Sequence, residues 1–206
     1  MANLLKLPSL DNEGNVHVVV ETPRGSRAKL TYDPDLRAFV LSKSLMAGLT
    51  YPHDWGFIPS TLAEDGDPVD ALVIHEAATS PGLVIKCKVI GMLEILEHRK
   101  KKKQRNDRVM AVPVNSHAEQ GLRDVRELTR QVREELEKFF VATAELQSKT
   151  LECLGWCGPK QALQFISEGH LAPGSPVWSP DPERESLPLP SSEGQEAVPN
   201  ARRRKG

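Results

Sequence analysis

The spacing of hydrophobic residues up to position 113 predicts a series of short β-strands. Runs rich in β-branched and aromatic residues are separated by turn-forming sequences such as Pro23-Arg24-Gly25 and Asp33-Pro34-Asp35. The segment Leu83–Glu97 alternates at first and is interrupted by Gly91, which indicates a long strand with a bend or a bulge. The other predicted strands are His17–Glu21, Ala28–Tyr32, Ala38–Ser42, Asp70–His75 and Arg108–Pro113.

After residue 120 the apolar residues recur at the spacing of one helix face. These positions are Leu128, Val132, Leu136, Phe139 and Phe140. A second, shorter helix is predicted after Gly158, because Pro159 suits a first helical position and Gly169 follows the last apolar residue. Short strands followed by helices predict a single α+β domain, a small β-barrel or curled sheet with helices packed on it.

Composition divides the chain into three parts. The 206 residues are 39% hydrophobic, enough for one core. Residues 172–206 contain seven prolines and end in Arg202-Arg203-Arg204-Lys205, and they hold too few apolar residues to offset the entropy of ordering. We therefore expect an N-terminal extension at 1–15, a barrel domain at 16–171 and a disordered Pro-rich tail with a basic end at 172–206.

Several classes of protein are excluded by what the chain lacks. No apolar run approaches the roughly 20 residues of a membrane-spanning helix, and the first residues do not resemble a secretory signal. Three cysteines do not make a disulfide framework and suit a reducing compartment, so we expect a cytoplasmic protein. A formal net charge of −1 gives no overall attraction to nucleic acid or to an anionic membrane.

The near-neutral charge conceals two local clusters. Glu64-Asp65-Gly66-Asp67-Pro68-Val69-Asp70 holds four acids in seven residues, which repel one another unless a cation neutralises them. Hard cations such as Mg²⁺ prefer such all-oxygen sites. An EF-hand counted from Asp65 fails, because Asp70 occupies the position that requires glycine. A solvated acidic turn is the structural alternative, but the apolar run at 71–74 anchors this turn to the core and favours a site.

The second cluster is basic and occupies residues 99–108, where seven of ten residues are Lys or Arg. We expect it in a loop between two strands.

The sequence does not support two other kinds of site. Cys153 and Cys157, with Cys87 or His170, lack the second close pair typical of zinc sites. A Gly-rich phosphate-binding loop of the P-loop type is absent from the sequence.

Two motifs resemble the soluble family I inorganic pyrophosphatases. Asp65–Ala71 resembles the signature D-x-D-P-x-D of that family, and Tyr51–Pro59 resembles its segment Y-P-x-x-Y-G-[FY]-I-P. The resemblance runs from about Val16 to Gly169. It implies a five-stranded, OB-like barrel with helices, Mg²⁺ dependence and hydrolysis of pyrophosphate to two phosphates. It also implies a homo-oligomer, a hexamer or a dimer.

The resemblance assigns roles to individual residues of this chain. Asp67 matches the carboxylate that takes a proton from the attacking water. The other matching positions are Asp65, Asp70 and Glu97 as metal ligands, Lys29 as a phosphate-binding residue, and Glu21 and Tyr51 as further active-site residues.

Other positions depart from the family pattern. Lys43 stands at a phosphate-binding Arg, which keeps the charge but loses the bidentate fork. The remaining departures are Thr31 for Glu, Trp55 for a phosphate-contacting Tyr, Asn106-Asp107-Arg108 for D-x-K, and Thr143-Ala144 for Tyr-Lys. The resemblance therefore implies Asn106 as a metal ligand unless Asp107 shifts by one place, and Trp55, Arg108 and Thr143 as substrate-binding residues.

Ala144 cannot replace a lysine, so one cation is missing from the pattern. Because the insert lies beside the expected site, Lys100–Lys103 could supply a replacement, and this is our hypothesis from the sequence.

Three functions remain open. The first is a Mg²⁺-dependent pyrophosphatase in which Asp67 deprotonates water while Lys29, Lys43 and Arg108 stabilise the departing phosphate. The second is a catalytically weakened relative that binds pyrophosphate, phosphate or another phosphorylated ligand, as the departures at 31, 106, 143 and 144 suggest. The third is a nucleic-acid-binding barrel that uses residues 99–108. It is disfavoured because the chain has few aromatic residues for stacking on bases.

Overall fold

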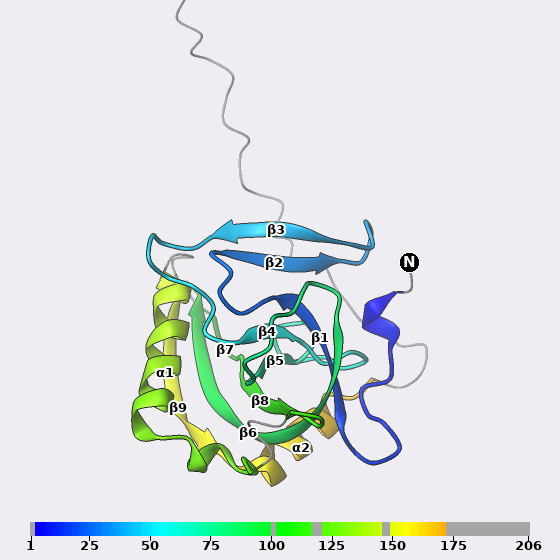
Figure 1. Ribbon diagram of the computed structural model, residues 1–206. Coiled ribbons are helices and arrows are strands. Elements are labelled where there is room, and N and C mark those ends of the chain that lie inside the picture. The colour runs from blue at the N-terminus through cyan, green and yellow to red at the C-terminus, as the bar shows by residue number, and fades with distance from the viewer. Residues whose placement is uncertain (1–2, 100–101, 117–120, 146–148, 172–206) are drawn as a thin grey trace, which may run out of the picture.

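A closed circuit of strand pairings forms the centre of the computed structural model, which describes residues 3–99, 102–116, 121–145 and 149–171 (Figure 1). The circuit contains β1 (Val16–Thr22), β4 (Asp54–Phe57), β5 (Asp70–Val73), β8 (Arg108–Pro113) and β6 (Val84–Arg99). Neighbours pair in that order and β6 returns to β1; only the pairing of β5 with β8 is parallel. The predicted five-stranded, OB-like barrel is confirmed.

The long strand β6 reaches beyond the barrel because it bends at the predicted glycine. Its register shifts between Val89 and Gly91, and Gly91 has φ +152°. A Cβ atom at Gly91 would lie 2.4 Å from the carbonyl oxygen of Cys157, so glycine is required there. The outer half of β6 pairs with β7 (Lys102–Arg105) and β9 (Thr150–Cys157).

The expectation that the basic residues 99–108 form a loop is wrong for much of that stretch. Arg99 pairs with Lys102, and Leu96 pairs with Arg105, so β6 and β7 form a hairpin. The strand is short and highly charged, which is how edge strands avoid pairing with other chains. Lys102 and Lys103 are exposed on it, whereas Lys100 and Lys101 lie outside the described residues.

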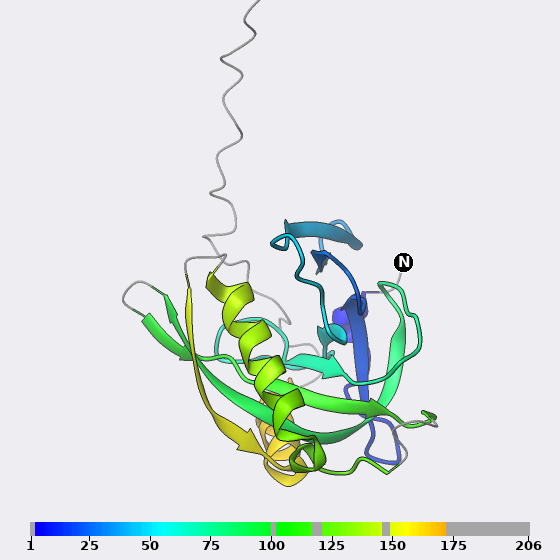
Figure 2. The same cartoon turned by 60° about the vertical axis from the view of Figure 1, so that its left-hand side comes forward.

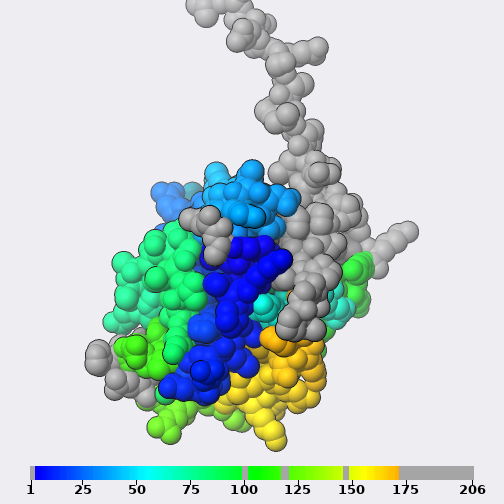
Figure 3. Space-filling view, turned by 90° about the vertical axis from the view of Figure 1, so that its right-hand side faces the viewer, coloured from blue at the N-terminus to red at the C-terminus, as the bar shows by residue number. Residues whose placement is uncertain are grey.

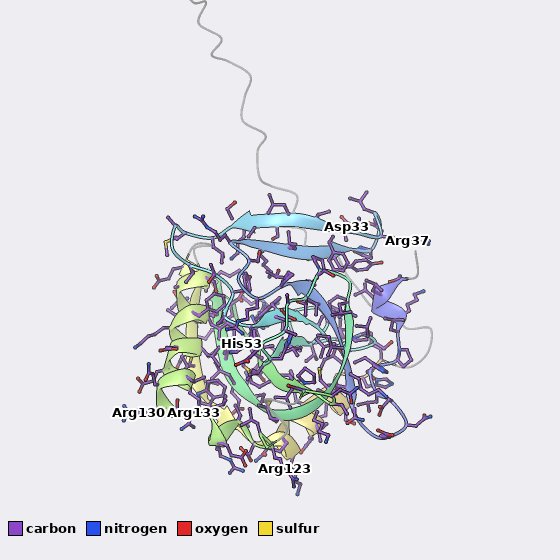
Figure 4. The ribbon with its side chains drawn as sticks, in the orientation of Figure 1. Asp33, Arg37, His53, Arg123, Arg130 and Arg133 are labelled. Atoms are coloured by element: carbon purple, nitrogen blue, oxygen red, sulfur yellow. The ribbon has the colours of Figure 1, made fainter. Side chains whose placement is uncertain are left out.

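A separate hairpin lies over one end of the barrel (Figure 1). It consists of β2 (Ala28–Asp33) and β3 (Ala38–Ser44). Figure 4 labels Asp33 and Arg37 at its turn, at the end remote from the long helix. At the other end Lys29 pairs directly with Lys43. The hairpin therefore brings two lysines together above the barrel.

Both predicted helices are present and cover the barrel from different sides. α1 (Arg130–Glu145) runs along β9 in Figure 2 and buries Leu136, Phe139 and Phe140 in the main apolar cluster. α2 (Pro159–Glu168) buries Ala162 and Ile166. Two short 3₁₀ turns, Leu4–Lys6 and Val125–Glu127, complete the regular structure of the described residues.

The N-terminal residues from position 3 pack on the barrel. Leu5 is 5% exposed within an apolar cluster that also contains Val19 and Phe57. The Ser9 hydroxyl lies 3.1 Å from His170 Nδ1, just after α2, and Figure 3 shows the N-terminal residues beside the orange end of α2. The predicted disorder of 172–206 concerns residues outside the described part.

Within the described ranges, no helix is both long and apolar enough to cross a membrane. The three cysteines are free thiols, since Cys87, Cys153 and Cys157 form no disulfide.

We expect Gly56→Ala to destabilise the protein by about 1–3 kcal/mol, because it overpacks the closest approach between β1 and β4. A Cβ atom there would lie 1.9 Å from the carbonyl oxygen of Val19. Urea unfolding measures the change. Gly121→Ala is the matched control, because a Cβ atom at Gly121 meets nothing within 4 Å. Equal stabilities of the two variants would contradict the close packing of these strands.

Candidate active site

Acidic and basic side chains converge at the barrel end beneath the hairpin. Asp67 lies in the loop before β5, and Asp70 is the first residue of that strand. Lys29 comes from the hairpin and Glu21 from the end of β1. The charges of Lys29, Asp67 and Asp70 all act on the Glu21 carboxyl, so these elements share one site.

The acidic turn is held in place by backbone bonds to the core. Gly66 has φ +88°, a conformation that favours glycine. The Asp67 amide donates to Asp65 Oδ1 at 3.2 Å, and the Ala63 amide donates to the Asp67 carbonyl at 2.8 Å. The Val69 amide donates to the buried Thr61 hydroxyl at 2.9 Å. The carboxylates are therefore presented on a fixed frame.

Burial leaves this turn with unfavourable negative charge. Desolvation, with repulsion from Asp70 and Asp67, raises the pKa of Asp65 to about 6. Burial also raises the pKa of Asp70, although the charges of Arg108 and Lys29 oppose this effect. Carboxylate oxygens under mutual repulsion are chemically suited to a hard divalent cation. Even so, no three His, Cys, Asp or Glu side chains among the described residues are grouped closely enough to hold a metal.

Arg108 and Trp55 form the side of the site that faces the acidic turn. Arg108 makes an ion pair with Asp70 at 2.5 Å and lies over the Trp55 indole, 5.0 Å from the ring centroid. Lys29 Nζ lies 5.7 Å from the same centroid. Trp55 Nε1 and Arg108 Nε are buried and have no hydrogen-bond partner among the described residues. Buried donors of this kind are normally satisfied, so they point to a ligand or water that accepts from them.

Glu97 and Asn106 extend the site along β6. Asn106 Nδ2 donates to Glu97 Oε2 at 3.2 Å, and Arg108 donates to Asn106 Oδ1. The Asn106 side chain therefore lies between Glu97 and Arg108, at the position where the resemblance implies a metal ligand.

Asp107 faces elsewhere. Its carboxylate accepts from the Ile95 amide at 2.8 Å and from Arg105 Nη2 at 2.9 Å. It borders a hollow of about 320 Å³ that is also lined by residues of α2, including Gln161 and Phe165. Of the two alternatives at this position, the structure brings Asn106 and not Asp107 together with Glu97 and Arg108.

Lys43 links the hairpin to the end of α1. Its Nζ donates to the Thr143 carbonyl at 3.0 Å, and burial with the charges of Lys29 and Lys149 lowers its pKa to about 8. The Thr143 hydroxyl donates to the Phe140 carbonyl at 2.9 Å, so its proton serves the helix. Thr143 thus meets the site through its carbonyl oxygen.

Tyr51 and Glu21 form the buried floor. Tyr51 is 4% exposed and packs edge-on against Phe139 at 5.1 Å between ring centroids, and burial raises its pKa. Glu21 accepts from the Tyr32 amide at 2.7 Å. Desolvation nevertheless raises the pKa of Glu21 to about 7.

The raised pKa of Glu21 predicts a pH-dependent loss of stability. The carboxyl is neutral in the folded protein below about pH 7, and in the unfolded chain below pH 4.5. Its favourable contribution to the free energy of unfolding is therefore complete below pH 4.5 and is lost as the pH rises through 7. A shift of this size corresponds to about 3 kcal/mol. Glu21→Gln should therefore be more stable than the wild type at pH 8 and similar at pH 4, as measured by urea unfolding.

Glu168→Gln, on the exposed side of α2, is the control and should leave the pH profile unchanged. An unchanged profile in Glu21→Gln would show that Glu21 is not the group that titrates.

Lys149 belongs to the site and was not expected from the sequence. Its Nζ lies 3.1 Å from Glu97 Oε1, and it precedes β9. The strand β9 is itself missing from the sequence-based prediction, so the residue just before it gave no reason to suspect a role.

His75, near the site, makes a contact that stabilises the fold. His75 Nε2 contacts Asp54 Oδ2 at 2.6 Å, and the Arg24 amide donates to the same carboxylate. Figure 4 places His53 in the middle of the view, whereas Arg130 and Arg133 lie at the rim beside α1 and Arg123 lies at the bottom of the view.

The fold and the site define a β-barrel that presents a carboxylate turn to a group of cations. A family model described as inorganic pyrophosphatase matches residues 18–172. Inorganic pyrophosphatase of Thermus thermophilus is 38% identical over 170 residues, covering 81% of this chain and 95% of that protein. The enzyme of Synechocystis is 34% identical over 166 residues, covering 81% and 96%.

A comparison with solved structures identifies the same family. The crystal structure of the Thermus thermophilus pyrophosphatase has a TM-score of 0.75 and 36% identity, and covers 82% of this chain and 97% of that chain. The chain belongs to the inorganic pyrophosphatase family.

Proposed function

We propose that this chain hydrolyses inorganic pyrophosphate to two phosphates. The observation that carries the proposal is the carboxylate turn of Asp65, Asp67 and Asp70 facing Lys29 and Arg108. A highly anionic substrate requires cations on its oxygens, and a water must lose a proton as it attacks. This site combines groups for both tasks.

Asp67 is the proposed general base. It lies in the turn between two other carboxylates, Asp65 and Asp70, and its side-chain oxygens are the groups there that would accept the proton of an attacking water. Its charge raises the pKa values of Asp65 and Asp70, so the three groups are electrostatically coupled.

We propose Mg²⁺ as the cofactor, with Asp65, Asp70, Glu97 and the neutral oxygen of Asn106 as donors that would draw together around the ion, since three such carboxylates are not already grouped among the described residues. Metal dependence is a property of the family to which the chain belongs. All four donors are oxygens, and the raised pKa of Asp65 reflects charge that a cation would neutralise. When bound, a divalent cation would offset the charge of the substrate and lower the pKa of water.

The anion is proposed to lie among Lys29, Lys43, Arg108 and Trp55. Two lysines directly opposite each other on antiparallel strands repel, and an anion bound between them would offset that repulsion in β2 and β3. The Trp55 indole N–H and the Arg108 Nε–H are buried donors that phosphate oxygens can satisfy. Arg108 and the lysines would stabilise charge on the departing phosphate.

The weakened-enzyme alternative is not favoured by the comparisons. The relatives that match over most of this chain are named inorganic pyrophosphatases. The departures at Thr31 and Ala144 change individual contacts, but the carboxylate turn and the opposing cations remain.

Substrate selectivity tests the proposal. Phosphate release from pyrophosphate, ATP and p-nitrophenyl phosphate is measured with Mg²⁺ present. We expect release from pyrophosphate to exceed the others by orders of magnitude, since the two phosphates must span the cations and the turn. Equal release from all three, or release only from the monoester, would refute pyrophosphate as the substrate.

We also propose a cytoplasmic homo-oligomer, a hexamer or a dimer. The free thiols Cys87, Cys153 and Cys157 support a reducing compartment, and the assembly rests on the family resemblance. Light scattering of the purified full chain measures the assembly, and a monomer at micromolar concentration would contradict it.

A further inference from the structure

The end of α1 gathers two lysines from distant parts of the chain. Lys43 Nζ donates to the Thr143 carbonyl at 3.0 Å. The Lys149 amide donates to the carbonyl of the next residue, Ala144, at 3.2 Å. Carbonyl groups at a helix C-terminus attract cations, which favours the Lys43 ammonium, while the backbone amide of Lys149 satisfies the neighbouring carbonyl and fixes the chain there. Lys149 is therefore fixed beside the hairpin lysine, although 106 residues separate them in the sequence.

The Lys149 side chain points from this anchor toward the carboxylates. Its Nζ lies 3.1 Å from Glu97 Oε1, with Lys149 16% exposed and Glu97 3% exposed. Glu97 in turn accepts from Asn106, which accepts from Arg108, which pairs with Asp70. A continuous polar chain thus joins Lys149 to the acidic turn.

Charge relations place Lys149 within the anion site. Its charge acts on Asp70 and on Lys43, whose pKa it helps to lower. Placing a partly buried ammonium close to the like-charged Lys43 is unfavourable unless an anion lies between them. Glu97 offsets part of that cost on one side, and phosphate oxygens would offset the rest on the other.

We propose that Lys149 is a substrate-binding residue whose ammonium contacts a phosphate of pyrophosphate together with Lys43. It supplies the cation that Ala144, five residues earlier and 6% exposed, does not provide. An ammonium carries three N–H donors, so contact with Glu97 is compatible with contact to a phosphate oxygen. This role deepens the proposed function, on which it rests, and it replaces Lys100–Lys103 as the source of the missing cation.

Substitutions of Lys149 in the full chain test the proposal. Lys149→Gln should weaken the binding of inorganic phosphate, measured by calorimetry, and raise KM for pyrophosphate, each by about 10- to 100-fold. Lys149→Arg should recover most of the affinity, because it keeps the charge. Lys160→Gln, on the exposed side of α2, is the matched control and should change neither quantity.

A purely structural ion pair predicts a different pattern. If Lys149 only holds Glu97, Lys149→Gln would lower the melting temperature or shift the Mg²⁺ concentration for half-maximal activity, with phosphate affinity and KM unchanged. That result overturns the proposal.

A measurement on the wild type remains decisive if Lys149→Gln does not fold. Phosphate should slow the acylation of Lys149 by a lysine-directed reagent, read by mass spectrometry, without slowing that of Lys160. Equal acylation of Lys149 with and without phosphate would contradict the contact.

The inference and the proposed function fail separately. Lys149-dependent phosphate binding without pyrophosphate turnover would leave the inference and remove the function. Full turnover with unchanged affinity in Lys149→Gln would do the reverse.

Discussion

Asp67→Asn is expected to lower kcat for pyrophosphate by about 10²- to 10⁴-fold, the range that a positioned general base contributes. Asparagine keeps the shape of the side chain and cannot accept the proton from water. Because the substitution removes one charge from a turn in which Asp65 and Asp70 have raised pKa values, the fold should be as stable as the wild type or more so.

Steady-state phosphate release and thermal unfolding together measure this separation of activity from stability. Asp35→Asn, in the exposed turn of the hairpin, serves as the control and should keep full activity. Activity in Asp67→Asn within twofold of the wild type would exclude Asp67 as the general base.

Arg108→Met is expected to destabilise the protein by about 1–3 kcal/mol, because it leaves the half-buried Asp70 carboxylate without its partner. The Arg108 side chain is 9% exposed, pairs with Asp70 at 2.5 Å and covers the Trp55 ring. We also expect kcat to fall by about 10²- to 10³-fold, the cost of losing one group that stabilises transition-state charge.

The pH dependence of this variant identifies the mechanism. Protonation of Asp70, whose pKa is raised by burial, removes the unpaired charge, so the destabilisation should become smaller as the pH falls, as measured by urea unfolding. Arg130→Met is the matched control, since the Arg130 side chain is 88% exposed and pairs with Glu134 on the surface of α1. Its effect should stay within about 0.5 kcal/mol. Similar losses in the two variants would contradict the buried pair.

The sequence predicted the parts of the fold in which local pattern and tertiary environment agree. The buried face of α1 follows the helical period, β1 is a run of β-branched residues, and Gly91 marks the bend of β6. The strand Asp54–Phe57 was missed because it is only four residues long and carries an acid and a glycine. β9 was missed because Gly155, with φ +150°, interrupts it and its inward positions include cysteines, which do not mark a strand from sequence.

In the basic hairpin of β6 and β7, the density of charged residues concealed a strand. Residues 102–105 read as a loop because they are Lys, Lys, Gln and Arg, yet they pair with the end of β6. Backbone hydrogen bonds to a neighbouring strand stabilise this edge without any apolar side chain.

The acidic half of the site was accessible from sequence, because its carboxylates lie within one turn. The cationic half was only partly accessible, since it depends on the register of the hairpin and the end of α1. Lys149 illustrates the limit: its role follows from the backbone bond to Ala144 and from Glu97 on β6, and no local motif encodes either contact.

Phosphate release from pyrophosphate by the purified full chain tests pyrophosphate hydrolysis most directly. With Mg²⁺ we predict two phosphates per pyrophosphate consumed and a kcat within about 1–10³ s⁻¹, the common range for enzymes, and we predict that a chelator abolishes the release. Saturable binding of pyrophosphate without release, in the presence of Mg²⁺, would contradict hydrolysis and identify a binding protein instead.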